Sequence, residues 1–383
     1  MVKTGQVKPI VPAVEQEQKT GVVELYQLLK ELCEKVGPSG FEQDVQRYIV
    51  NEVADKVDEV EVDALGNVIA TIKATDAEMP SILLAAHADE IGFVVKKIED
   101  NGTLRFEQLG GFDNRILLAQ PVTVKGAEGY VNGVIGTLSA HYAKWDDPKR
   151  IASHRDMYID IGASSKEEVL EMGVKVGQPV SYGSELKLVG DKKRNRVVGK
   201  GLDDRAGCAL LIQLIQNFRQ NPDLSHGDVH FVFTVQEEVG LRGASVLSPK
   251  FHPDFALAID TTPTSDTHDV LMTGTRKLGA GPCIKIADRS LIAHPLVSGL
   301  LEKVAVEKNI PYQQEIFMGI GTDAGAIHMT STGVSSGVVS IPSRYTHSPI
   351  EIVDLADLEN SVKLVQEFIL HSKELVGKNF LDT

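Results

Sequence analysis

The stretch SILLAAHADE at residues 81–90 decides the fold of this chain. Its first six residues, 81–86, form a short and almost wholly apolar run, as expected for a strand in the middle of a sheet that is covered on both faces. Two similar runs follow, FVFTV at 231–235 and FALAI at 255–259. Acidic or imidazole side chains come directly after each run. Open α/β sheets place their active sites at this carboxyl edge, so the sequence predicts an α/β fold with a site there.

Helical periodicity accompanies these strands. Apolar residues recur at three- and four-residue spacing in the segments 22–36, 41–53, 204–219, 295–309 and 354–373. Ser39, followed by Glu42 three residues later, predicts a capping box at the start of the second of these helices. Further strands are expected at 59–63 and 68–73.

The segment 93–190 has a different pattern. Apart from one short helix expected at 165–172, short β-like runs alternate there with glycine-rich turns. We interpret it as a β-rich domain inserted into an α/β domain that consists of residues 21–92 and 191–383. Residues 1–20 contain two prolines and no apolar core of a signal peptide, so we predict that they form a flexible tail.

The composition excludes several classes of protein. The formal net charge is −14, from 39 basic and 53 acidic residues, which argues against a nucleic-acid partner because a phosphate backbone requires clustered Lys and Arg. No apolar stretch approaches the roughly 20 residues of a membrane-spanning helix. Three scattered cysteines form neither a disulfide framework nor a metal-binding pair, so we expect a reduced, cytoplasmic protein without a membrane partner.

His87 and Asp89 are the first candidate site residues. A lone histidine at a strand end is more often structural than a metal ligand. Asp89 changes that balance because strand residues two positions apart face the same side. Its carboxylate could accept the imidazole N–H, as metal-bound histidines commonly require.

Two pairs of adjacent carboxylates favour a cation more strongly. Asp203 and Asp204 begin a helix, where one capping aspartate would suffice and a second adds repulsion. Glu237 and Glu238 end an apolar strand, where charged groups are costly to desolvate unless they are paired or metal-bound. One glutamate could bind a metal while its neighbour acts as a general base. The spacing does not determine which of the two is the ligand and which is the base.

Asp260 after the third apolar run and His347 in a turn complete the candidate set. Two histidines and three carboxylates suit Zn²⁺, Co²⁺ or Mn²⁺ better than Ca²⁺, which prefers oxygen ligands alone. With Asp203 bridging two ions, each ion would have three protein ligands and a position open to water, as catalytic sites require.

Six motifs occur in order along the chain: HADEIGF (87–93), GGFD (110–113), LDDRAG (202–207), QEEVGLRGA (236–244), GTDAGAIH (321–328) and IPSRYTHSP (341–349). They resemble the motifs of the tetrahedral (TET) aminopeptidases, the glutamyl- and leucyl-aminopeptidase-like metallopeptidases of family forty-two. The resemblance covers nearly the whole chain beyond the first 20 residues or so.

The resemblance implies two divalent metal ions per subunit, Zn²⁺ or Co²⁺, with Mn²⁺ as a third candidate. One ion would be held by His87, Asp260 and Asp203. The other would be held by Glu238, His347 and again Asp203, which bridges the two ions. These five residues are the predicted metal ligands.

The resemblance also assigns the proton transfers. Glu237 would be the general base and acid that activates a water shared by the two ions, and Asp89 would orient His87. The peptide bond between Asp203 and Asp204 is implied to be cis. The reaction would be hydrolysis of the first peptide bond of short peptides, with a glutamyl- or leucyl-type preference.

The implied fold is a three-layer αβα zinc-peptidase (phosphorylase/hydrolase-like) domain with an inserted PDZ-like β-barrel domain that mediates dimerisation. Dimers in the family assemble into a tetrahedral homododecamer. A deacylase or dipeptidase on the same scaffold, an endoglucanase, and a non-catalytic binding protein are the rival interpretations. Arg344, Arg276 and Lys277 could bind an acidic substrate side chain, although a structural salt bridge is an equal alternative for Arg344.

Overall fold

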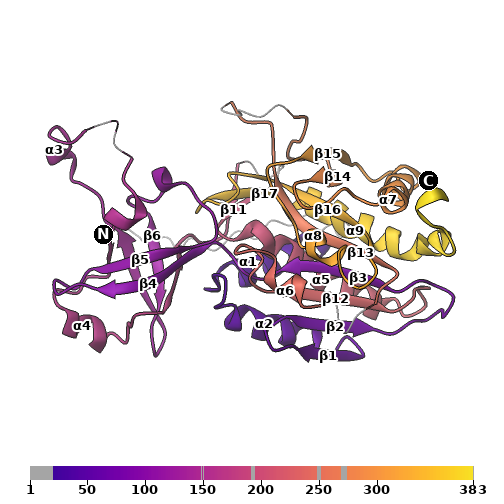
Figure 1. Cartoon of the computed structure of the whole chain (residues 1–383), viewed down its shortest axis with the longest axis horizontal. Coiled ribbons are helices and arrows are strands. Elements are labelled where there is room, and N and C mark those ends of the chain that lie inside the picture. The colour runs from indigo at the N-terminus through magenta and orange to yellow at the C-terminus, as the bar shows by residue number, and fades with distance from the viewer. Residues whose placement is uncertain are drawn as a thin grey trace, which may run out of the picture.

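The computed structural model of the chain describes residues 20–147, 149, 151–190, 195–247, 252–268 and 274–382. The predicted N-terminal tail therefore lies outside the described residues, except for Thr20. The described part forms a large sheet with helices on both faces and a β-barrel set to one side of it (Figure 1).

Within the described part, one mixed sheet of 11 strands forms the centre of the larger body. Its main path runs β1 (Glu59–Val62), β2 (Val68–Ile72), β12 (Val229–Thr234), β3 (Ile82–His87), β13 (Phe255–Pro263), β16 (Ser335–Arg344), β17 (Glu351–Asp354), β11 (Arg196–Gly199) and β10 (Lys187–Val189), with β14 (Cys283–Asp288) and β15 (Gln313–Phe317) off this path. The neighbours β12, β3, β13 and β16 are parallel. Because β17 is antiparallel to both β16 and β11, β11 points the same way as these four.

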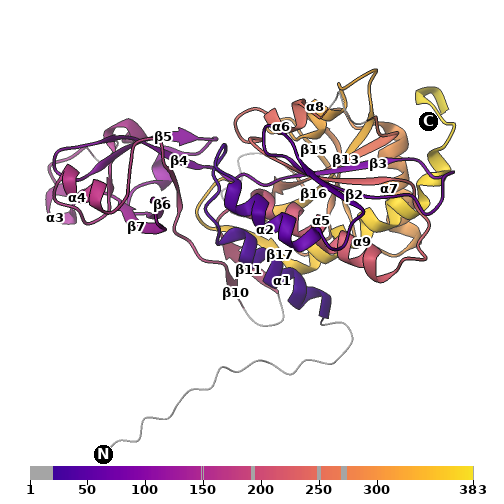
Figure 2. The ribbon, with the colours of Figure 1, turned by 90° about the horizontal axis from the view of Figure 1, so that it is seen from below.

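Helices cover both faces of this sheet (Figure 2). One face carries α1 (Thr20–Cys33), α2 (Gln43–Val53), α5 (Leu202–Gln220), α7 (Pro295–Glu307) and α9 (Leu355–His371). The opposite face carries the short helices α6 (Arg242–Ser245) and α8 (Ala324–Ile327). Strand β3 is buried throughout, with Leu84 in the first core and Leu83 in the second. The predicted strand in a doubly covered sheet is confirmed.

The inserted β-rich segment is confirmed as a closed antiparallel barrel. Its strands are β4 (Gly92–Ile98), β5 (Leu104–Leu109), β6 (Pro121–Lys125), β7 (Tyr130–Ile135), β8 (Ile159–Asp160) and β9 (Pro179–Tyr182). Phe93 lies in its core, with its ring centroid 5.0 Å from that of Phe106 and 5.4 Å from that of Tyr182. Helix α4 (Lys166–Glu171) agrees with the one helix expected here, whereas α3 (Ala140–Ala143) was not predicted.

The third predicted strand was placed too short. Strand β13 does not end at Ile259 but continues to Pro263, so Asp260 lies within it. The reason is its neighbour β16, which pairs with β13 along its whole length, whereas β3 pairs only with Phe255–Ala258. The other predicted helices and strands occur within a few residues of their expected bounds.

Glu90 connects the sheet to the barrel at the point where the chain passes from β3 to β4. Its buried carboxylate accepts hydrogen bonds from Lys200 Nζ at 2.9 Å and from Ser181 Oγ in β9 at 3.0 Å. It also accepts from the backbone N–H of Gly37, beyond α1, at 3.1 Å. A buried ion pair is tolerated when its remaining hydrogen-bonding positions are filled, and here Ser181 and Gly37 donate to the carboxylate beside Lys200.

Two expectations from composition can be compared with the structure. Cys33, Cys208 and Cys283 are buried free thiols, as the absence of a disulfide framework predicted. Among the described residues, no helix combines the length and apolar character that crossing a bilayer requires.

Candidate metal centre

The five residues predicted to bind metal come from strands that point the same way. His87 ends β3, Asp260 lies in the second half of β13, and Glu238 follows β12. Asp203 follows β11, and His347 follows β16. Because the carboxyl ends of parallel strands meet at one edge, the fold brings these side chains together.

Asp203 lies between the two histidines. Its Oδ1 is 3.3 Å from Nε2 of His87, and its Oδ2 is 3.4 Å from Nε2 of His347. Nε2 of His347 is 3.2 Å from Oε1 of Glu238, and Nε2 of His87 is 3.8 Å from Oδ1 of Asp260. Two ligands bound tetrahedrally at about 2.0–2.2 Å from one ion lie roughly 3.3–3.6 Å apart. The spacing therefore fits two neighbouring metal sites that share Asp203.

Several carboxylate oxygens in the cluster are buried without a hydrogen-bond donor among the described residues. These are Oδ1 of Asp203, Oδ2 of Asp204 and Oε1 of Glu238. Such atoms are costly unless a cation or another partner satisfies them. His87, Asp203 and Glu238 offer ligand atoms within 4.8 Å of one another, as do His87, Asp204 and Asp260. The donor set thus fits a divalent transition metal.

Asp204 is a ligand candidate to which the sequence argument gave no role of its own. Its Oδ1 accepts a hydrogen bond from the backbone N–H of Gly207 at 3.0 Å, whereas its Oδ2 is buried without a donor among the described residues. A Cβ at Gly207 would approach Oδ2 to 2.3 Å, so a glycine is needed there. The peptide bond between Asp203 and Asp204 is cis, as the family resemblance implies.

Backbone carbonyls orient both imidazole rings. Nδ1 of His87 lies 3.1 Å from the carbonyl oxygen of Asp89 and 3.5 Å from its carboxylate Oδ1. The shorter contact is to the main chain, whereas the sequence argument gave this role to the side chain. Nδ1 of His347 lies 2.7 Å from the carbonyl oxygen of Gly111. When Nδ1–H donates to these carbonyls, Nε2 of each ring is the nitrogen that faces Asp203, and it would have to give up its proton to bind a metal.

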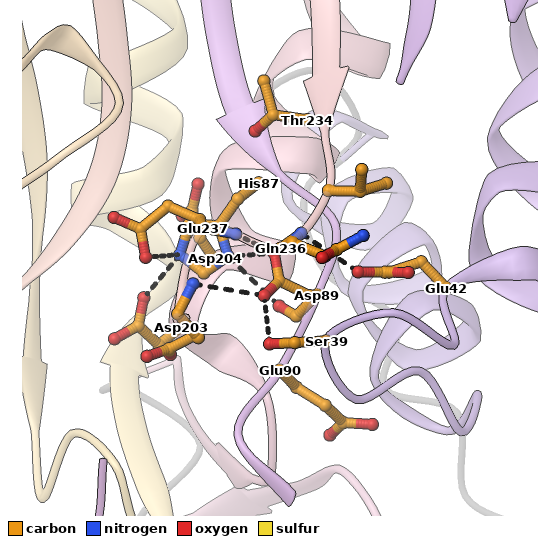
Figure 3. A network of polar contacts seen from close by, with 12 residues as sticks. Ser39, Glu42, His87, Asp89, Glu90, Asp203, Asp204, Thr234, Gln236 and Glu237 are labelled. Atoms are coloured by element: carbon orange, nitrogen blue, oxygen red, sulfur yellow. Dashed lines mark hydrogen bonds and ion pairs between the residues drawn. The ribbon is translucent and has the colours of Figure 1, made fainter. Parts of the chain in front are cut away.

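The segment that carries both glutamates is held by two carboxylates (Figure 3). Asp89 accepts hydrogen bonds from the backbone N–H of Glu237 at 3.0 Å and of Glu238 at 3.2 Å. Glu42 accepts from the backbone N–H of Gln236 at 3.0 Å. Three consecutive amides are thus fixed by side chains from distant parts of the chain. Asp89, which is fully buried, therefore positions the catalytic candidates and not only His87.

The predicted capping box between Ser39 and Glu42 was wrong. The Ser39 hydroxyl donates to Oδ2 of Asp89 at 2.6 Å, and Glu42 accepts from the backbone N–H of Gly40 at 2.7 Å. Helix α2 begins without a side-chain cap. Both side chains instead contact residues beside the candidate site, Asp89 and Gln236, which a local sequence pattern cannot show.

We expect Ser39→Ala to lower kcat by about three- to tenfold without changing the metal content. The substitution removes one of the hydrogen bonds that hold Asp89, and such a bond contributes about 1 kcal/mol. Initial rates and elemental analysis would measure both quantities. Ser361→Ala is the matched control, because the buried Ser361 hydroxyl donates to the carbonyl of Asp357 within α9. An equal loss of rate in both variants would contradict a positioning role for Ser39.

Glu351 is a positioning residue that the sequence argument missed. Its buried carboxylate accepts hydrogen bonds from the backbone N–H of His347 at 2.8 Å and of Asp203 at 3.1 Å. Burial, together with the charge of Asp203, raises the pKa of Glu351 to about 8. One side chain therefore sets the relative position of two predicted ligands from different elements.

Burial determines the electrostatics of the acidic groups. It raises the pKa of Glu237 and of Asp260 well above the usual range of carboxyls. Burial also acts to raise the pKa of Asp203, but the adjacent imidazoles of His347 and His87 outweigh it, so this pKa lies below its usual value. Such a concentration of buried carboxylates is unfavourable unless positive charge is close by.

A cavity of about 480 Å³ lies over the cluster. Its lining includes His87, Asp203, Glu237, Glu238, Asp260 and His347. The wall also includes the end of β13 and residues that follow β12, β14 and β15, among them Leu241, Arg289 and Ile320. A small substrate in this cavity would therefore meet Glu237 and the predicted ligands directly.

The basic residues that the sequence offered for substrate recognition do not line the cavity. Arg344 donates to Asp266 through Nε at 2.9 Å and through a terminal nitrogen at 2.6 Å. The guanidinium of Arg276 lies 4.7 Å from the ring centroid of Phe317. Neither arginine belongs to the described cavity lining, and nor does Lys277. The structural salt bridge was the correct alternative for Arg344.

Comparison with known proteins supports a peptidase. A family model described as M42 glutamyl aminopeptidase matches residues 66–364. A glutamyl aminopeptidase of Lactococcus lactis is 31% identical over 339 residues, covering 88% of this chain and 93% of the relative. A lysyl aminopeptidase of Pyrococcus furiosus is 31% identical over 353 residues, covering 91% of this chain and 98% of the relative.

Solved structures resemble the whole fold. The aminopeptidase APDkam598 of Desulfurococcus kamchatkensis is 38% identical and has a TM-score of 0.86, covering 94% of this chain and 99% of its own. The TET1 peptidase of Pyrococcus horikoshii, described as assembling into a tetrahedron or a large octahedral shell, is 35% identical with a TM-score of 0.80, covering 91% and 99%. A Thermotoga maritima protein called an endoglucanase is 34% identical with a TM-score of 0.72, covering 90% and 97%.

Proposed function

This chain belongs to the M42 glutamyl aminopeptidase family and is an aminopeptidase, and from that premise we propose that it removes N-terminal residues from short peptides at a two-metal centre. The observation that carries the proposal is the Asp203 carboxylate, whose two oxygens face the Nε2 atoms of two different histidines. A shared carboxylate between two imidazoles suits a pair of adjacent ions.

We assign His87 and Asp260 to one ion, Glu238 and His347 to the other, and Asp203 to both. Zn²⁺ or Co²⁺ suits this mixture of nitrogen and oxygen ligands, and Mn²⁺ is a third candidate. When bound, such ions supply Lewis acidity to the attacking water and to the carbonyl of the scissile bond.

Glu237 moves the proton in this mechanism. Its side chain lines the cavity, and its Oε2 is 4.0 Å from Nε2 of His87. Glu238, in contrast, lies 3.2 Å from Nε2 of His347, as a ligand of the same ion would. Glu237 takes a proton from the attacking water and returns it to the amine that leaves. Asp89 accepts hydrogen bonds from the backbone amides of both glutamates and so fixes the position of the base, Glu237, relative to the ligand, Glu238.

We also propose that subunits associate through the barrel into dimers and then into a homododecamer. The tetrahedron described for the Pyrococcus horikoshii peptidase and the dodecamer described for PhTET1-12s support this proposal. Exposed apolar side chains on the barrel, among them Tyr130, Val134 and Val176, are suited to burial at an interface.

A panel of aminoacyl para-nitroanilides, assayed with and without Co²⁺ or Zn²⁺, tests the proposed activity. We expect release of nitroaniline that a chelator abolishes and added metal restores. Release of reducing sugar that survives chelation would favour an endoglucanase instead. Cleavage of N-acylated amino acids or of dipeptides alone would favour a deacylase or dipeptidase.

A further inference from the structure

Asp323 is a buried carboxylate that the proposed reaction does not use. It belongs to the GTDAGAIH motif at 321–328, which supplies none of the five predicted ligands. The residue is 3% exposed and stands directly before the short helix α8, where an aspartate commonly caps a helix. Here its side chain makes no capping hydrogen bond. A buried carboxylate without that bond is expected to have another partner.

The partner of Asp323 is the hydroxyl of Thr234 at the end of β12. The fully buried Thr234 Oγ1 forms a short hydrogen bond to Oδ2 of Asp323. It also lies 3.3 Å from the carbonyl oxygen of Ala86, the residue before His87 in β3. The hydroxyl therefore joins the start of α8 to the ends of two neighbouring strands.

Thr234 begins the segment that leads to both glutamates (Figure 3). The backbone amides of residues 235–238 all donate to side chains from other segments, namely Asn67, Glu42 and Asp89. Glu42 precedes α2 on one face of the sheet, whereas Asp323 precedes α8 on the other face. The contact between Asp323 and Thr234 thus holds this segment from the face that Glu42 does not reach.

The hydrogen bond between Asp323 and Thr234 can be removed from either end. Oδ1 of Asp323 is buried without a donor among the described residues, so the bond through Oδ2 is the one that this side chain makes there. Burial raises the pKa of Asp323 to about 6, so the carboxyl is mostly ionised at neutral pH. Thr234 then donates to a charged acceptor, and such bonds are stronger than neutral ones.

We propose that Asp323 is a positioning residue for the proposed reaction: through Thr234 it fixes the end of β12, from which the base Glu237 and the ligand Glu238 extend. This inference rests on the proposed aminopeptidase function and adds a residue to it. Asp323 is absent from the cavity lining, so it acts through Thr234 and not on the substrate. A general base must lie within hydrogen-bonding reach of the water that it activates, so a small displacement of Glu237 lowers the rate.

The first test compares Asp323→Ala with Asp323→Asn, both loaded with Co²⁺, on the best anilide. Alanine removes the acceptor of the Thr234 hydroxyl, whereas the asparagine amide can still accept from it. We expect Asp323→Ala to lose about ten- to a hundredfold in kcat, as for a hydrogen bond to a charged group, with KM changed less than about twofold. Asp323→Asn should lose less than about threefold. Equal losses in the two variants, or no loss in Asp323→Ala, would overturn the proposal.

Asp357→Ala is the matched control. Asp357 is a carboxylate that is 1% exposed and accepts from the backbone N–H groups of Gly279 and Gly281, each at 2.7 Å. It lies outside the cavity lining. We expect the control to keep kcat within about threefold, because its hydrogen bonds do not hold the segment that carries Glu237. A loss of kcat equal to that of Asp323→Ala would show a general effect of deleting a buried carboxylate and would refute the positioning role.

The second test removes the same bond from Thr234. Valine has the shape of threonine without the hydroxyl, so Thr234→Val should reproduce the loss of kcat, and Thr234→Ser should restore most of it. The double variant Asp323→Ala/Thr234→Val should lose no more than the weaker of its two single variants, because both remove one bond. Losses that multiply would show that the two residues act independently and would contradict the proposal.

Amide hydrogen exchange of peptides covering residues 234–240, followed by mass spectrometry, needs no turnover. We expect faster exchange in Asp323→Ala and in Thr234→Val than in the unchanged enzyme, and no change in Asp357→Ala. This pattern supports the positioning role even if the unchanged enzyme refuses every anilide, in which case only the proposed function fails. Unchanged exchange in all variants refutes the inference and leaves the proposed function standing.

Discussion

Glu237→Gln is expected to retain both metal ions and to lose nearly all turnover. Glutamine has the shape of glutamate but cannot accept the proton of the attacking water, and loss of a general base typically costs about 10²–10⁴ in rate. Asp89 accepts its hydrogen bonds from the backbone N–H groups of this segment, so the substitution leaves them intact. Steady-state rates on the best anilide and metal analysis of the same sample would measure the two effects.

Two comparisons make this result specific. Glu128→Gln changes an exposed glutamate of the barrel in the same way and should leave kcat unchanged. Glu238→Gln should weaken the binding of one ion, because Glu238 lies beside His347. If Glu237→Gln instead retained more than about a tenth of the activity, or lost metal as Glu238→Gln does, the division between base and ligand would be wrong.

Asp203→Ala is expected to release both ions and reduce activity to background. The residue faces both histidines, so each proposed site loses a ligand at once. The measurement is the metal content per subunit after exhaustive dialysis, which should fall from about two to near zero. The fold should survive, because the contact of Asp203 with Glu351 is made by the backbone amide.

Single-site variants provide the contrast for this prediction. Asp260→Ala and Glu238→Ala should each lose one ion and retain the other, since each is assigned to a single ion: Asp260 with His87 and Glu238 with His347. If Asp203→Ala kept one full equivalent of metal while its circular dichroism spectrum remained unchanged, Asp203 would be a ligand of one ion and not a bridge.

The fold class could be predicted from the sequence because the patterns that indicate it lie within short segments of the chain. An apolar run such as 81–86 is buried on both faces wherever it lies, and the polar residues after it must then reach the carboxyl edge. Adjacent carboxylates at such an edge have few explanations other than a cation. The acidic pairs at 203–204 and 237–238 therefore identify the candidate site from the sequence alone.

The hydrogen bonds that hold the candidate site residues in place could not be predicted from the sequence, because they join residues that are distant in the chain. Ser39 and Glu42 have the spacing of a capping box, yet their partners are Asp89 and Gln236. Gly111 contributes only a carbonyl oxygen, which every residue has, so its GGFD motif gave no indication of its role. Asp323 stands where a capping residue would, yet its side chain contacts Thr234 instead.

The contacts of Glu90 determine where the barrel can be exchanged for that of a related protein. In a chimaera whose foreign segment runs from 92 to 180, Glu90, Ser181 and Lys200 all come from the host, so the hydrogen bonds from Ser181 and Lys200 to Glu90 are kept. If the junction is placed after Tyr182, where β9 ends, residue 181 comes from the donor protein. The hydrogen bond to Glu90 is then kept only if the donor protein has a hydroxyl at that position. The suitable junctions for exchanging the barrel are thus determined by the hydrogen bonds of the buried Glu90 carboxylate and not by the ends of the strands.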